Sequence, residues 1–264
     1  MLHLWQHGQQ RMSDSSVKTD EKKQHFDDIY VAETPVPFKE RIMDELKYVS
    51  DNFNRQIFDR LILPWAQQKT VSGTPLNFVD LAGCFGNTTI AMLNGMDHDA
   101  IRENWKDAES ASRVAGERRF PAHVTGIDIS ANALDYGRSA GIYDSTIKAD
   151  LNNPDLDAKA QVDDALKDAD ILISTAALVY LEPDAIENIL DAFAANSSEG
   201  YLLVNFLNPF ALEAADATKR NLLERFEFVG SMASRHRLMS ELERSNYPGE
   251  AWVMLEIWVL KRTK

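Results

Sequence analysis

The feature that most constrains the fold is the stretch Asn77-Phe78-Val79-Asp80-Leu81-Ala82-Gly83-Cys84-Phe85-Gly86-Asn87. Its first half is apolar and strand-like and contains the carboxylate Asp80, and its second half is rich in small residues. Small residues allow backbone N–H groups to approach a ligand closely. The next residues, Thr88 to Leu93, predict a helix, whose positive N-terminal end suits a carboxylate or phosphate. The stretch therefore predicts a strand, a tight turn that binds a ligand, and a helix.

A second unit of the same kind follows along the chain. Residues 124–128 predict a short strand that ends in Asp128, and Ser130 can cap a helix from Ala131 to Ala140 that Gly141 closes. A carboxylate at such a strand end can accept hydrogen bonds from both hydroxyls of a ribose. The apolar residue that follows it, Ile129, can lie against the face of an adenine.

A third acid extends the pattern. Residues 146–151 predict the end of another strand and place Asp150 where it can accept a hydrogen bond from an adenine amino group. Each of these acids taken alone is read more simply as a solvated loop carboxylate. Acids at three successive strand ends instead favour a nucleoside site, because the carboxyl ends of parallel strands share one edge of the sheet.

The remaining strands complete an α/β pattern. Residues 170–174 and 201–206 are continuous apolar runs, as expected where helices cover both faces of a parallel sheet. Residues 226–230 and 252–260 predict two more strands with no helix-length crossover between them, which favours an antiparallel hairpin at the sheet edge. We therefore predict a Rossmann-like, doubly wound, mostly parallel seven-stranded sheet with a C-terminal antiparallel β-hairpin and an N-terminal helical cap.

Glycine spacing separates two nucleotide-binding interpretations of the first turn. A dinucleotide site requires G-x-G-x-x-G, and only Gly83 and Gly86 are present. An acid at the end of the first strand followed by small residues resembles motif I, D-x-G-x-G-x-G, of class I S-adenosylmethionine-dependent methyltransferases. Ala82 and Cys84 occupy the first two glycine positions of that motif, and Gly86 occupies the third.

The order of elements over residues 76–264 also resembles this methyltransferase family, which implies S-adenosyl-L-methionine as cofactor and S-adenosyl-L-homocysteine as product. By this resemblance, the methionine end of the cofactor would be held by Asp80 and the backbone of Ala82, Gly83 and Gly86, and the ribose would be bound by Asp128. The adenine would be surrounded by Ile129, Asp150 and Leu151, and the segment Ser174, Thr175 and Ala176 would pass beneath the sulfonium.

Upstream of this domain we expect a flexible polar tail at residues 1–25 and a helical cap or lid at 26–75. The cap carries apolar residues every three or four positions from Ile42 to Leu61, with a break near Ser50-Asp51. Helices in this position form a lid over the cofactor in the resembling enzymes, so Tyr30, Tyr48 and Phe53 are candidates to line the site. Core packing is the alternative for each. A helical insertion is expected at residues 97–122.

Methyl transfer is an in-line displacement, so the protein mainly aligns the acceptor and excludes water. A general base is needed only when the acceptor loses a proton. His236, expected between the last two strands, is one candidate, although a surface histidine among basic neighbours is the reading that we favour. Tyr180, Asn205 and Asn208 follow the fourth and fifth strands and can orient an acceptor.

Composition narrows the function classes. A net charge of −13 argues against a bulk nucleic-acid binder, because phosphate backbones require clustered Lys and Arg. The single cysteine, Cys84, excludes an internal disulfide, fits a cytoplasmic location and is read as a packing residue rather than a nucleophile. No zinc-type cluster and no apolar run long enough to span a membrane is visible in the sequence.

These observations predict a methyltransferase that uses S-adenosylmethionine to modify the oxygen, nitrogen or carbon of a small molecule, with secondary metabolism as one setting. One alternative is a catalytically inactive regulatory protein that binds the adenosyl cofactor, which the altered motif I favours. Another is a nicotinamide-dependent oxidoreductase, which the missing third glycine and the terminal hairpin disfavour.

Overall fold

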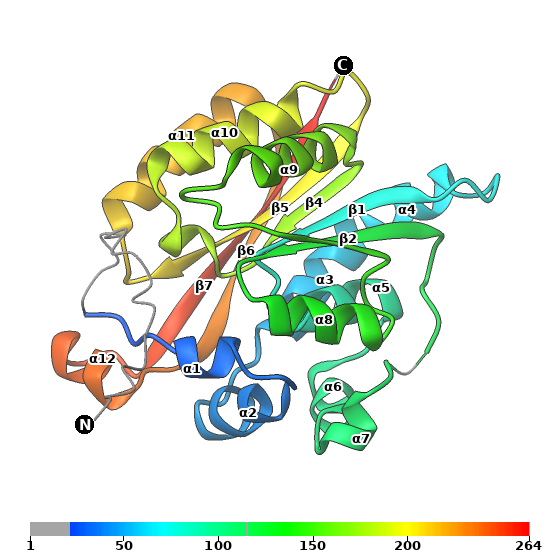
Figure 1. Ribbon diagram of the computed structural model, residues 1–264. Coiled ribbons are helices and arrows are strands. Elements are labelled where there is room, and N and C mark those ends of the chain that lie inside the picture. The colour runs from blue at the N-terminus through cyan, green and yellow to red at the C-terminus, as the bar shows by residue number, and fades with distance from the viewer. Residues whose placement is uncertain (1–21, 115, 264) are drawn as a thin grey trace, which may run out of the picture.

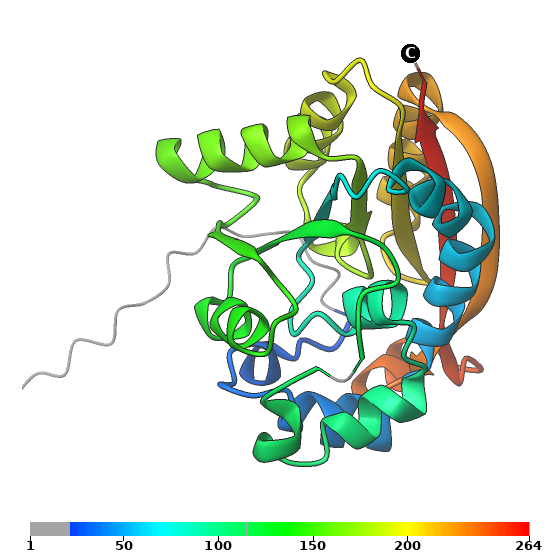
Figure 2. The same cartoon turned by 90° about the vertical axis from the view of Figure 1, so that its right-hand side faces the viewer.

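The computed structural model describes residues 22–114 and 116–263, in which a seven-stranded sheet lies between two layers of helices (Figures 1 and 2). The strand order is β3-β2-β1-β4-β5-β7-β6. The first five of these pair in parallel, and β7 runs antiparallel to both β5 and β6. The predicted fold class is therefore confirmed. The strands are β1 (Leu76–Leu81), β2 (Ala122–Asp128), β3 (Ser145–Lys148), β4 (Ile171–Ser174), β5 (Gly200–Asn208), β6 (Glu227–Leu238) and β7 (Trp252–Arg262).

Helices cover both faces of the sheet. One face carries α3 (Ser50–Leu61), α5 (Asn87–Asn94) and α8 (Ala131–Ser139), and the other carries α9 (Leu156–Asp168), α10 (Pro183–Ala194) and α11 (Leu212–Arg225) (Figure 1). Successive strand residues point to opposite faces, so Ile171 and Ile173 join the first core and Leu172 joins the second. Burial on both faces explains why these strands read as continuous apolar runs.

Three of the N-terminal helices, α1 (Asp27–Tyr30), α2 (Val36–Phe38) and the π-helix η1 (Lys39–Glu45), lie near the end of the sheet where the parallel strands finish (Figure 1). The helix α4 (Leu63–Lys69), which follows α3, lies near the opposite end, where the ring of Trp65 is 4.9 Å from that of Tyr201 at the start of β5. The helical pattern breaks at residues 46–49, just before Ser50, where Lys47 has a positive φ of 54°. Phe38 anchors this region, with its ring 5.7 Å from that of Tyr48, 5.9 Å from Trp105 and 6.5 Å from Phe85.

Two short helices, α6 (His98–Asn104) and α7 (Ala108–Ala111), lie between α5 and β2, within the segment where we expected a helical insertion. Residues 1–21, which make up most of the expected flexible tail, lie outside the described part of the chain. Residues 23–25, which we assigned to that tail, instead contact the folded domain. No helix in the described ranges is long and apolar enough to cross a membrane.

The C-terminal pair differs from a tight hairpin. β6 extends to Leu238, well beyond the predicted end at Gly230, and α12 (Glu241–Asn246) lies in its connection to β7. β6 is the edge strand, and its middle alternates small and polar residues because its outer side faces solvent. The sequence therefore reads as a loop there. As a result, His236 lies within β6 rather than between the last two strands.

Candidate cofactor site

The predicted acids meet at the carboxyl edge of the parallel strands. Asp80, near the end of β1, is aligned with Gly126 of β2, and Asp128 ends β2 beside Lys148 at the end of β3. Asp150 lies in the turn directly after β3. The three acids thus lie at one edge of the sheet, where ligands of open α/β folds bind.

The turn after β1 keeps the conformation that glycines favour, although two of its three key positions hold other residues. Ala82, Cys84 and Gly86 have φ angles of 56°, 51° and 76°. All three lie in the left-handed region, which costs a residue with a Cβ about 1–2 kcal/mol relative to glycine. They are the three positions at which the motif has glycine, so the replacements preserve the path of the turn. This strained backbone is held between the strand and α5.

Asp80 lies beneath this turn rather than on its surface. Its side chain is completely buried, and Oδ2 accepts hydrogen bonds from the hydroxyls of Thr89 (2.7 Å) and Tyr143 (2.9 Å). Burial raises the pKa of Asp80 to about 6 despite these two hydrogen bonds. Gly83 crosses directly over the carboxylate, since a Cβ at this position would lie 2.1 Å from Oδ2. Asp80 therefore supports the turn, and any effect on a ligand passes through the turn's backbone.

Asp128 joins the turn to the second strand. Its Oδ2 accepts the backbone N–H of Cys84 at 2.9 Å, and its Oδ1 accepts that of Ser130 at 2.8 Å. Burial raises the pKa of Asp128, and these N–H groups partly counter the shift. A carboxylate can accept about four hydrogen bonds, so Asp128 retains capacity for a ligand hydroxyl. The neighbouring side chain, Ile129, is 53% exposed.

The loops after β3 and β4 are tied together beside these residues. Asp150 and Leu151 are partly exposed, and Asp150 Oδ1 accepts the N–H of Asn152 at 3.0 Å. Asn152 in turn donates to the carbonyl oxygen of Tyr180 at 3.0 Å and accepts the N–H of Glu182 at 2.8 Å. Tyr180 ends the 3-10 helix η2 (Leu178–Tyr180), so this network fixes the position of η2 at the edge of the site.

Only part of the predicted segment after β4 faces this edge. Ser174 is buried, and strand alternation places its side chain on the same face as Leu172, away from α3. Thr175 is partly exposed, and its hydroxyl oxygen lies 3.2 Å from that of Thr88 at the start of α5. Ala176 follows with a positive φ of 58°. Thr175 is thus the side chain that links this segment to α5.

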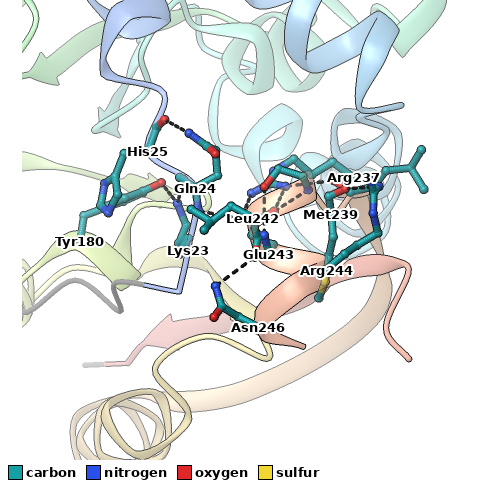
Figure 3. A network of polar contacts seen from close by, with 12 residues as sticks. Lys23, Gln24, His25, Tyr180, Arg237, Met239, Leu242, Glu243, Arg244 and Asn246 are labelled. Carbon is teal, nitrogen blue, oxygen red and sulfur yellow. Dashed lines mark hydrogen bonds and ion pairs between the residues drawn. The ribbon is translucent and has the colours of Figure 1, made fainter. Parts of the chain in front are cut away.

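The N-terminal residues 22–31, which we call the strap, contact the residues around this edge at both ends, and Figure 3 shows the end that contains Lys23 and Gln24. The Lys23 ammonium donates to the Tyr180 hydroxyl and lies 4.1 Å from the centre of its ring. The N–H of Gln24 donates to Oε1 of Glu243 at 3.0 Å, and Arg237 binds both oxygens of Glu243 at 2.7 Å each. The strap is therefore fixed at this end to η2 and α12.

The other end of the strap reaches the second strand end. The carbonyl oxygen of Tyr30 accepts the Ser130 hydroxyl at 2.7 Å, and that of Val31 accepts the Asn132 amide at 2.7 Å. Desolvation raises the pKa of Tyr30, and Cys84 and Asp128 are near enough to add to the shift. Tyr30 therefore lies beside the predicted ribose position, as a lid residue would.

His236 is not a surface residue, which corrects the reading that we favoured from the sequence. Its side chain is 7% exposed, Nδ1 lies 2.6 Å from the Ser50 hydroxyl oxygen, and its ring packs 5.3 Å from that of Tyr48. Burial, with Arg237 and Lys23 nearby, lowers the pKa of His236 well below its usual value. The imidazole is therefore neutral at neutral pH. The basic neighbours do not reveal this burial, because a β-bulge between Arg235 and Arg237 interrupts the alternation of β6. His236 and Arg237 are both buried, whereas Arg235 is exposed.

Asn205 and Asn208 also differ from their predicted positions after the fifth strand, because β5 extends to Asn208. Asn205 is buried within the strand and donates to Oδ1 of Asn54 on α3 at 3.1 Å. Asn208 is exposed and is the last residue of β5. Neither follows the strand in the way that we expected of residues that orient an acceptor.

Sequence reasoning missed a buried polar cluster between α3 and α5. Asp51 is completely buried, and its Oδ1 accepts the Tyr48 hydroxyl at 2.9 Å, the Asn87 amide at 2.8 Å and the Thr88 hydroxyl at 3.3 Å. An acidic residue near the start of a helix is normally predicted to be an exposed residue of the first turn. The available signal was the polar run Ser50-Asp51-Asn52 between apolar positions of the cap.

Among the comparisons with known proteins, only solved structures give matches. No family model and no curated protein matches the sequence. Similar solved structures include magnesium protoporphyrin IX methyltransferase from Synechocystis PCC 6803 with bound SAH (14% identity, 79% of this chain and 83% of that chain, TM-score 0.40). TehB from Haemophilus influenzae is another (12%, 80% and 67%, TM-score 0.43), as is geranyl diphosphate methyltransferase with GPP and sinefungin (9%, 76% and 76%, TM-score 0.42).

Likeness at this level carries no argument about function, so the classification rests on the chain's own topology. Five parallel strands in the order β3-β2-β1-β4-β5, extended by β7 and β6 in antiparallel pairing, form the sheet. The acids and the left-handed turn lie at its carboxyl edge. The chain has the class I methyltransferase fold that its sequence predicted.

Proposed function

We propose that the protein is an S-adenosylmethionine-dependent methyltransferase that acts on a small molecule. The observation that carries this proposal is the pairing of Asp128 with the turn after β1. One buried carboxylate accepts the N–H of Cys84 and still has free acceptor capacity at the carboxyl edge of the sheet. This is the position where a ribose would be held in an open α/β fold.

The residues present fit an adenosyl group. Asp128 would accept a ribose hydroxyl, because its carboxylate has acceptor capacity beyond the backbone N–H groups that it binds. The half-exposed Ile129 would cover one face of the adenine, and Asp150 and Leu151, both partly exposed, would border it. The backbone of the left-handed turn would take the methionine end, and Gly83 and Gly86 let this turn pack closely on the buried Asp80 and Ile142 side chains beneath it.

When bound, this cofactor supplies a methyl group on a positively charged sulfur. The protein's own residues then bind the acceptor, orient it and exclude water. The strap is suited to exclude water, because its two ends are hydrogen-bonded to Tyr180 and Glu243 on one side and to Ser130 and Asn132 on the other. Tyr180 is thereby placed beside both the strap and the Asp150 loop, where it can orient an acceptor.

Calorimetry with S-adenosylhomocysteine and, separately, with NAD tests the proposal. We expect saturable binding of the former, none of the latter, and weaker binding of S-adenosylhomocysteine in Asp128→Asn. Binding of NAD alone would overturn the proposal in favour of an oxidoreductase. A protein that binds S-adenosylhomocysteine but transfers no labelled methyl group to any fraction of small molecules would instead be the catalytically inactive binding protein.

A further inference from the structure

Two threonine hydroxyls connect the partly exposed edge of the candidate site to a buried carboxylate. The hydroxyl oxygens of Thr175 and Thr88 lie 3.2 Å apart, and that of Thr88 lies 3.3 Å from Oδ1 of Asp51. Thr175 is partly exposed, Thr88 is 3% exposed and Asp51 is completely buried. The three side chains thus form one path from the edge of the sheet into the core on the α3 face.

The path has a defined direction. Asp51 accepts the single hydroxyl hydrogen of Thr88, so Thr88 must accept the hydrogen of Thr175 in their shared contact. The lone pairs of the Thr175 oxygen then remain available to a further donor at the edge of the site. All hydrogen bonds along the path therefore point inward, toward the carboxylate.

Asp51 has neither an ion-pair partner among the described residues nor a partner for its Oδ2. The titratable groups that face it are Tyr48 from the chain before α3, His98 from α6 and, through Tyr48, His236 from β6. His236 is neutral, and no lysine or arginine of the described ranges lies within ion-pair distance of Asp51. Burial of a charge is costly and raises the pKa of Asp51, and the nearby His98 and the hydrogen bonds that Asp51 accepts counter this shift only in part.

We propose that Thr175 and Thr88 relay to Asp51 the proton that the methyl acceptor releases. This inference rests on the proposed function. It also defines the acceptor class: a hydroxyl, thiol or neutral N–H group, which must lose a proton on methylation, rather than a tertiary amine or an ionised carboxylate. Asp51 and Thr88 are positioning residues, and Thr175 is the group that would touch the acceptor.

The step balances in atoms, electrons and charge. The bond between the acceptor atom and its hydrogen breaks, and its electron pair forms the new bond to the methyl carbon. The electron pair of the methyl–sulfur bond stays on sulfur. The released proton passes to Thr175, the Thr175 proton to Thr88, and the Thr88 proton to Oδ1 of Asp51. One positive and one negative charge disappear together, which favours the step in a poorly solvated site.

The relay can be tested without cofactor or acceptor, by infrared spectroscopy of the Asp51 carboxylic acid. The acid carbonyl band appears as the pH is lowered from neutrality, and it is identified as the band that Asp51→Asn removes. If that variant does not fold, the band is identified by the shift that Thr88→Val produces, because a hydrogen bond to the group is lost. Mixing into D2O then gives the rate at which the Asp51 proton exchanges with solvent.

We expect Thr88→Val and Thr175→Val each to slow this exchange by about tenfold or more, and Thr88→Ser, which keeps the hydroxyl, to restore it. Thr89→Val is the matched control, because Thr89 is the next residue on α5 but its hydroxyl binds Asp80. Equal rates in the wild type and Thr88→Val, or equal slowing in Thr89→Val, would overturn the relay. Failure to bind S-adenosylhomocysteine would refute the proposed function but would not affect the exchange rates, so the two outcomes can be distinguished.

Discussion

The backbone N–H of Cys84 donates to Oδ2 of Asp128 across 2.9 Å, which couples the turn after β1 to the end of β2. The same carboxylate accepts the N–H of Ser130 at the start of α8. A side chain that holds two backbone segments and retains acceptor capacity organises the site and also contacts whatever binds there. Substitutions of Asp128 should therefore affect both binding and folding.

Asp128→Asn is expected to weaken binding of S-adenosylhomocysteine by about 1.5–3 kcal/mol, because the amide offers one acceptor oxygen in place of two charged ones. We choose asparagine over alanine because removal of both oxygens would also leave two backbone N–H groups without partners. Calorimetry gives the affinity. Asp135→Asn, at an exposed position of α8, should leave it unchanged. An unaltered affinity in Asp128→Asn would refute the ribose assignment.

Gly83→Ala should destabilise the protein by about 1–3 kcal/mol, because the added Cβ would overlap the buried Asp80 carboxylate. Urea unfolding measures this loss. Gly141→Ala is the control for backbone strain alone, since Gly141 has a φ of 79° and no atom within 4 Å of the added Cβ. Unchanged stability in Gly83→Ala would refute the close contact of the turn with Asp80.

Ala82→Gly should stabilise the protein by about 0.5–1 kcal/mol, because relief of left-handed strain exceeds the added flexibility of the unfolded chain. The unfolding midpoint in urea tests this. Ala160→Gly, at an exposed site inside α9, should change stability in the opposite direction, by about 1 kcal/mol. A destabilised Ala82→Gly would show that residue 82 does not adopt the left-handed conformation.

Asp80→Asn should change how stability depends on pH. Burial raises the pKa of Asp80 from 3.8 to about 6, so the native state binds more protons than the unfolded state between these values. The contribution of Asp80 to the free energy of unfolding is then fully present below about pH 4. It decreases by an amount on the order of 3 kcal/mol as the pH rises through about 6. Asp80→Asn removes the loss, so its stability relative to the wild type should rise over this interval. A constant difference across pH 4–7 would contradict the assigned shift.

Glu243→Gln should destabilise the protein by about 3–5 kcal/mol, because the buried Arg237 would lose its counter-charge. The strap should also loosen, since Glu243 holds the N–H of Gln24. Limited proteolysis near residue 24 and urea unfolding report the two effects separately. Glu224→Gln on the exposed side of α11 is the matched control. Unchanged protease resistance would mean that Glu243 does not fix the strap.

Much of the fold could be predicted from the sequence because both faces of the central strands are buried. Continuous apolar runs at residues 170–174 and 201–206 leave few alternatives to a parallel sheet between helices. The edge strand β6 was predicted too short, since only one of its sides is covered and its polar middle resembles a loop. Strand boundaries at an exposed edge depend on pairing with β7, which local sequence does not encode.

The site could be predicted only in part. Strand ends located Asp128 and Asp150 at one edge, because parallel pairing aligns them regardless of side-chain detail. How deeply each side chain is buried could not be predicted: Asp80 lies under the turn, and His236 is buried against Ser50. Burial depends on which other segments cover a residue, such as the turn at Gly83 and the strap, and the local sequence does not show which segments these are.

The left-handed turn at Ala82 and Cys84 bears on how such sites are found in sequence. Torsion angles, and not glycine content, define the shape of the loop, and a well-packed strand and helix can hold alanine and cysteine in that shape at a modest energetic penalty. Sequence searches that depend on the glycines of the motif will give such chains low scores. A search keyed to the acid before the turn and the acid that receives its amide would recover them.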